Sequence, residues 1–202
     1  MDNSRPLSTF GIAAATGIWL VIAVIAGASG FLTSLAPPLP QLILLGLLLI
    51  LIIAFRLSSR FREWSLSVDI NVFILFNLVR FIGVYFLILY SEGRLPYDFA
   101  VPGGWGDIVI AALAVLLILF VPASGKTGRS LYFIWNILGL ADILFVVATA
   151  GRLAMAEPES MGELLKLPLS LLPTFIVPII IYIHIILFLR LYKSKKRGCG
   201  AI

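Results

Sequence analysis

Long apolar runs alternate with short polar segments along this 202-residue chain. An α-helix that crosses a bilayer needs about 20 mostly apolar residues, and these runs have that scale. The runs predict six spans, over residues 10–31, 41–55, 66–90, 106–121, 131–150 and 167–189. We therefore expect an all-α integral membrane protein, with six transmembrane helices in an antiparallel up-down bundle that makes one membrane domain of residues 1–202.

The first of these runs has a second possible interpretation, as a cleaved signal peptide. Its segment Ala26-Gly27-Ala28 resembles a cleavage site. The apolar core of a signal peptide is usually about 7–15 residues, however, and this run is longer. We favour a retained span.

Composition and charge fit a membrane protein and weaken other readings. Hydrophobic residues make up 61% of the chain, against about 45–50% in an average soluble domain. The net charge is +5, but most basic residues flank span ends, which is typical of membrane orientation. We expect a lipid bilayer as the main partner, no nucleic acid partner, and a sequence compatible with a homo-oligomer.

The distribution of basic residues predicts the orientation of the spans. Lys and Arg beside span ends favour the cytoplasm. One side carries eleven of them: Arg5, Arg56, Arg60, Arg62, Lys126, Arg129, Arg190, Lys193, Lys195, Lys196 and Arg197. The other side carries only Arg94, Arg152 and Lys166. Both termini should therefore be cytoplasmic, in a multi-pass protein of the inner or plasma membrane whose basic tail rests on anionic lipid headgroups.

Arg80 stands apart, because it lies inside the third apolar run. A charge at membrane depth costs about 2.5–3.5 kcal/mol on insertion scales, so it needs a partner or a hydrated cavity. Asn77 precedes it by one helical turn and shares its face. Arg80 is either an anchor for an anion or substrate, or half of a buried ion pair that fixes helix packing.

The fifth span supplies the best expected partner for Arg80, the carboxylate of Asp142. Both residues lie in the middle third of their spans. An unpaired carboxylate in hydrocarbon would take up a proton, whereas pairing with Arg80 would keep it ionised. Asp142 is thus also a candidate for proton coupling. Asn136 lies in the same span, and Gly151-Arg152-Leu153 follows it much as Gly93-Arg94-Leu95 follows Asn77, which indicates either a duplicated hairpin or chance similarity.

Asp107 allows two interpretations. It would open the fourth span after a polar loop over residues 91–105, where an aspartate caps free backbone N–H groups. Alternatively, it joins an outward-facing mouth with Tyr97, Asp98 and Trp105, held in shape by the glycines and prolines of the loop. We include Asp107 in the candidate polar site with Asn77, Arg80, Asn136 and Asp142.

Other reactive residues are scarce. Cys199 is the single cysteine, so no intrachain disulfide or cysteine metal cluster can form. His184 is the single histidine, which excludes haem bound by two histidines of one chain. One histidine could still serve a dimer or a mixed ligand set, but a hydrogen-bonded packing role is favoured. We expect no metal and no cofactor, and we assign no catalytic residue.

One string resembles a known signature. It reads Arg80-x-x-Gly83, then Gly93-x-Leu95-Pro96-x-x-Phe99-Ala100, then Pro102-Gly103-x-x-Gly106-Asp107. It is similar to a signature of small, uncharacterised bacterial multi-span membrane proteins. The resemblance implies a bacterial-type inner or plasma membrane, and it brings no activity, substrate or cofactor.

Three function hypotheses remain open. The first is a small-solute or ion transporter, or a subunit of one, which uses the buried Arg/Asp site. The second is a membrane-embedded enzyme that acts on a lipid or isoprenoid, with Asp107 or Asp142 as acid or base. The third is a structural or assembly partner whose polar groups serve packing alone.

Overall fold

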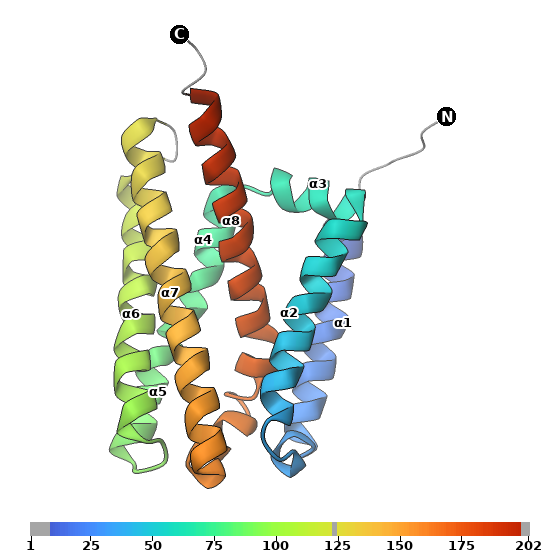
Figure 1. The fold of residues 1–202 in the computed structure, drawn as a ribbon, viewed down its shortest axis with the longest axis vertical. Coiled ribbons are helices and arrows are strands. Elements are labelled where there is room, and N and C mark those ends of the chain that lie inside the picture. The colour runs from blue at the N-terminus through green and yellow to red at the C-terminus, as the bar shows by residue number, and fades with distance from the viewer. Residues whose placement is uncertain (1–8, 123–124, 199–202) are drawn as a thin grey trace. The chain divides into compact units, whose positions relative to one another are not determined.

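The computed structural model describes residues 9–122 and 125–198, and every regular element in these ranges is a helix (Figure 1). Six helices are long and apolar enough to cross a membrane. They cover Phe10–Ala28, Leu39–Leu57, Ile70–Ser91, Tyr97–Phe120, Thr127–Ala156 and Leu172–Tyr192. The expectation of an all-helical chain with six such helices is confirmed for the described residues.

The third of these helices is a composite of three segments. α4 (Ile70–Phe76) is followed by the 3₁₀ segment η2 (Asn77–Ile82) and then by α5 (Gly83–Ser91). Asp69 starts it as an N-cap, because its side chain accepts a hydrogen bond of 2.7 Å from the backbone N–H of Asn71. The change to 3₁₀ geometry falls on the turn that carries Asn77 and Arg80, and mid-helix 3₁₀ often marks a functional or strained stretch.

The fourth helix corrects the expected loop. α6 runs from Tyr97 to Phe120, so only a short connection separates it from α5. Tyr97, Asp98 and Trp105 therefore lie on a helix, and the expectation of a loop through residue 105 was wrong. Glycine and proline disfavour helices in water. In a bilayer, however, backbone N–H and C=O groups must form hydrogen bonds within the protein, which favours helix. Glycine is also common where membrane helices pack closely.

The described residues form two compact units. The first unit holds residues 9–67 and 150–182, with α1 (Thr9–Ala28), η1 (Leu32–Ser34), α2 (Leu39–Leu57), α3 (Ser59–Ser67), η3 (Pro158–Leu165) and the π-helical turn η4 (Leu172–Ile176). In this unit α1 packs on η4, where Trp19 Nε1 donates to the Thr174 carbonyl over 2.9 Å. The short helix α3 is held by Ser65, whose hydroxyl lies 2.7 Å from that of Tyr182.

The second unit holds residues 68–149 and 183–198. It contains α4, η2, α5, α6, most of α7 (Lys126–Ala156) and most of α8 (Val177–Gly198). α5 and η2 lie side by side with α6 (Figure 1). The buried positions of α6 include a row of small residues at helical spacing: Ala100, Gly104, Ala111 and Ala114. Such rows let helix backbones approach closely. All candidate polar residues identified in the sequence lie in this second unit.

Candidate polar site

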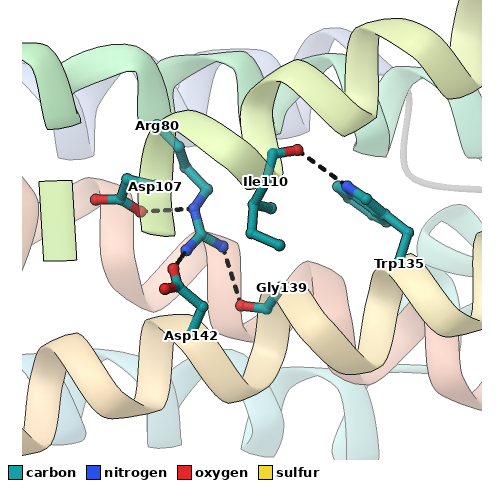
Figure 2. A network of polar contacts seen from close by, with 6 residues as sticks. All are labelled: Arg80, Asp107, Ile110, Trp135, Gly139 and Asp142. Carbon is teal, nitrogen blue, oxygen red and sulfur yellow. Dashed lines mark hydrogen bonds and ion pairs between the residues drawn. The ribbon is translucent and has the colours of Figure 1, made fainter. Parts of the chain in front are cut away.

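The guanidinium of Arg80 is the centre of a polar cluster in the second unit. Its side chain is 1% exposed. Nε donates to Asp107 over 2.7 Å, Nη1 donates to the Gly139 carbonyl over 3.0 Å, and Nη2 donates to Asp142 (Figure 2). One side chain thus joins η2 to α6 and to α7. A planar guanidinium suits this task, because its donors point in fixed and different directions.

Asp107 reaches Arg80 because the backbones of η2, α5 and α6 come very close together. A side chain at Gly83 would collide with the Gly104 carbonyl and would lie 3.0 Å from Asp107 Cβ. Asp107 is buried, ten residues inside α6, so its expected role as the cap of the fourth span was wrong. The helix begins at Tyr97 instead, with Pro96 preceding it.

Asp142 approaches the same guanidinium from α7. Gly106 of α6 makes room for it, because a side chain at that position would overlap the Asp142 carboxylate. The pairing of Arg80 with Asp142 that the sequence suggested is present, and Asp107 joins it as a second carboxylate. The two differ in access: the Asp142 side chain is 17% exposed and that of Asp107 is 5% exposed.

The cluster holds more negative than positive charge. Arginine keeps its proton in proteins, so Arg80 contributes one positive charge. Asp107 and Asp142 contribute two negative charges when both are ionised. Arg80 is the only basic side chain in ion-pair contact with either of them among the described residues. One proton or another single positive charge is therefore needed to make the cluster neutral.

A second polar group lies next to Gly139. His184 of α8 is buried, and its Nδ1 lies 2.8 Å from Asn136 Oδ1. The amide nitrogen of Asn136 donates to the His184 carbonyl over 3.1 Å. A side chain at Gly139 would collide with the His184 ring, so this glycine lets the imidazole approach α7. The sequence suggested a packing role for His184, but nothing in it linked His184 to Asn136.

Trp135 ties the same region to α6. Its Nε1 donates to the Ile110 carbonyl over 3.0 Å (Figure 2). Its ring centroid lies 5.4 Å from that of His184. Residue spacing along the chain did not indicate the hydrogen bond between Trp135 and Ile110. The only hint in the sequence was a tryptophan in an apolar span, because the N–H of a buried tryptophan usually has an acceptor.

The remaining candidate residues are not among the groups that bond to the Arg80 guanidinium. Asn77 is fully buried and donates to the Phe73 carbonyl over 3.0 Å, one turn before Arg80. Tyr97, Asp98 and Trp105 are exposed, and the Tyr97 ring centroid lies 5.7 Å from that of Tyr90. These three residues lie on α6 and not on a loop, and their part in an outward-facing mouth stays a prediction.

Two further expectations concern partners and metals. Within residues 9–122 and 125–198, no group of three or more His, Cys, Asp or Glu side chains is placed to hold a metal ion. Arg5 and Cys199 lie outside the described residues, as do the side chains of Lys193, Lys195, Lys196 and Arg197 in the basic C-terminal tail. Arg190, which begins the tail, is described and donates to the Val68 carbonyl. The proposed contact of that tail with anionic headgroups stays a prediction.

Comparison with known proteins gives one match. A family model described as a domain of unknown function, DUF8737, matches residues 37–192. That range includes every residue of the polar cluster and every candidate site residue. The searches of curated proteins and of solved structures gave no match.

Proposed function

The chain belongs to the DUF8737 family, a domain of unknown function, and we propose that it is a membrane transport protein whose cluster of Arg80, Asp107 and Asp142 binds a coupling cation. The proton is the simplest such cation. The transported species is a small solute or an ion. The protein resides in the plasma membrane, with both termini in the cytoplasm.

One observation carries the proposal, namely the charge imbalance at membrane depth. Two carboxylates contact a single guanidinium inside helices that are long and apolar enough to span a bilayer. An unbalanced charge in such a place is costly, and ionisable groups there commonly belong to proton or ion pathways. Binding a cation neutralises the cluster, and releasing it restores the charge. This exchange is the elementary step of a coupled transporter.

The two carboxylates have different parts in this mechanism. Asp107 is nearly inaccessible and holds Nε of the guanidinium, so it serves as a fixed anchor for Arg80. Asp142 is the more exposed of the two, so it is the carboxylate that gains and loses the cation. When Asp142 is neutralised, its attraction to Arg80 weakens, and Nη2 becomes available to an anionic or polar group of a solute.

The experiment uses the full-length protein in lipid vesicles that contain a pH-sensitive dye. Mixtures of small amino, carboxylate and sugar solutes are added outside, and the internal pH is recorded. The wild type should move protons in response to at least one mixture. Asp142→Asn should reduce this response to that of protein-free vesicles, because the amide cannot exchange a proton at this site.

Asp69→Asn is the matched control, because asparagine also caps a helix and Asp69 lies at the start of α4. It should retain the response of the wild type. A wild type that moves no protons with any mixture would contradict the proposal. So would an Asp142→Asn variant that matches the wild type.

A packing role is the second candidate, and one observation favours it. The guanidinium makes three hydrogen bonds to two helices, and such a set of bonds is suited to fixing the packing of those helices. In that case Asp142→Asn would lower thermal stability in vesicles and leave every solute response unchanged. Both candidates predict lower stability for this variant, so the solute response is the measurement that separates them.

A further inference from the structure

The hydrogen bonds of His184 determine which ring nitrogen carries its proton. The amide nitrogen of Asn136 is committed to the His184 carbonyl, which can only accept. Asn136 Oδ1 therefore faces the ring, and it can only accept as well. It follows that Nδ1 of the neutral imidazole is the donor, and that Nε2 is left with a free lone pair. Nε2 is thus a hydrogen-bond acceptor inside the second unit.

Within the described residues of the second unit, this acceptor and one other are buried without a donor. Nε2 of His184 and Oδ1 of Asn77 have no hydrogen-bond partner among the described residues. Both side chains are 0% exposed. Buried polar atoms in native proteins nearly always have partners, either protein atoms or small bound molecules. Two orphan acceptors in one unit therefore point to a bound donor.

Both orphan acceptors lie next to residues that hold Arg80. Asn77 comes one 3₁₀ turn before Arg80 on η2, so the two side chains share a face. The His184 ring lies against Gly139, whose carbonyl accepts from Nη1 of Arg80. Asn136, which orients the ring, comes one turn before Gly139 on α7. Asn77 is thus linked to Arg80 through η2, and His184 is linked to it through Gly139.

We propose that His184 Nε2 and Asn77 Oδ1 together bind one small molecule that presents two polar hydrogens, in the size class of water or an ammonium ion. One hydrogen bonds to the imidazole nitrogen and the other to the amide oxygen. Both acceptors are uncharged, so the site takes a neutral donor as readily as a cation. This site does not depend on the transport activity proposed above.

Because His184 is the only histidine of the chain, nitrogen NMR reads the site directly. The full-length protein is labelled with ¹⁵N-histidine and placed in lipid vesicles at neutral pH. The chemical shifts of the two ring nitrogens then report whether each is protonated, bare or accepting a hydrogen bond. We expect a protonated Nδ1 and an Nε2 that accepts a hydrogen bond.

Titration with salts identifies the donor. A saturable change of the Nε2 shift with ammonium chloride, absent with tetramethylammonium chloride, indicates an ammonium ion, because the second cation has no N–H. An Nε2 shift of the hydrogen-bonded kind that no salt changes indicates water. Either result supports the site. A bare Nε2 under all conditions overturns the proposal, and so does an Nε2 that itself carries the proton.

Asn77→Leu tests whether the two acceptors share their occupant. It should move the Nε2 signal toward that of a bare nitrogen, because the occupant loses half of its bonds. Asn71→Leu is the matched control, since it makes the same change on α4 at a residue that instead contacts Tyr132. An Nε2 signal that Asn77→Leu leaves unchanged would overturn the shared site.

Discussion

At the scale of single residues, the second unit is organised around the Arg80 guanidinium and the groups that accept its hydrogen bonds. Arg80 is among the largest fully buried side chains, and three of its five N–H donors have identified acceptors. Each acceptor comes from a different turn of α6 or α7. Lysine has a single charged nitrogen, so it cannot reproduce this set of bonds.

The burial of the two carboxylates predicts how much each contributes to stability. Asp107→Asn should destabilise the protein by about 3–5 kcal/mol, which is the usual cost of removing one partner of a buried ion pair. Asp142→Asn should cost less, about 1–3 kcal/mol, because its side chain is more exposed. Unfolding titrations in mixed micelles measure both values.

The companion variant is the double change of Arg80→Met with Asp107→Asn, which removes both charges of the buried pair. It should be more stable than the sum of the two single changes implies, because neither Arg80 nor Asp107 is left charged without the other. Equal costs for the two aspartates, or strict additivity in the double variant, would show that burial does not govern this cluster.

At the scale of elements, glycines decide which helices can meet. Gly83 and Gly104 let η2 and α5 approach α6, while Gly106 leaves the space that the Asp142 carboxylate occupies. Gly139 does the same for His184. The polar cluster is thus a consequence of backbone proximity, and the side chains reach one another only because the glycine positions lack a Cβ.

This arrangement predicts different changes in stability for three glycine-to-alanine substitutions. Gly106→Ala should destabilise the protein and impair the response that depends on Asp142, because the new methyl group displaces that carboxylate from Arg80. Gly46→Ala on α2 should stabilise by up to about 1 kcal/mol, since helix propensity improves and nothing lies within 4 Å of the added atom.

Gly103→Ala is the control on the same helix. Its nearest neighbour is a methyl group of Val146 at 3.3 Å, which has only to shift slightly. We expect Gly103→Ala to lie between the other two in thermal stability. A Gly106→Ala variant as stable and active as Gly46→Ala would contradict the assigned packing.

At the scale of the whole molecule, the chain is a set of apolar helices whose membrane orientation is predicted from the flanking charges. Six described helices are long and apolar enough to span a bilayer. The Lys and Arg residues collect beside alternate span ends, with Arg56 in the last turn of α2, Arg60 and Arg62 in α3, and Lys126 with Arg129 at the start of α7. This asymmetry predicts the orientation of every span.

Cysteine labelling in intact cells checks the orientation. The native Cys199 should react with a membrane-impermeant maleimide only after the cells are permeabilised, because the C-terminus is expected in the cytoplasm. In a Cys199→Ser background, Glu159→Cys on η3 should react in intact cells. The opposite pattern, or labelling of both positions from outside, would reverse or dismiss the predicted topology.

The sequence by itself determined the membrane character, the helical class and the need for an acidic partner near Arg80. These features follow from local properties: the length of each apolar run and the cost of a charge in hydrocarbon. Asp142 could be chosen as a partner because its depth in the fifth span matches that of Arg80 in the third.

Only the tertiary structure decided which groups meet. It placed Asp107 inside α6, because packing against Gly83 and the demand for internal backbone bonds extend that helix back to Tyr97. It also joined His184 to Asn136, 48 residues apart, and gave Arg80 the carbonyl of Gly139. Such contacts depend on how closely helices approach and how they rotate about their axes, and residue spacing along one chain does not contain that information.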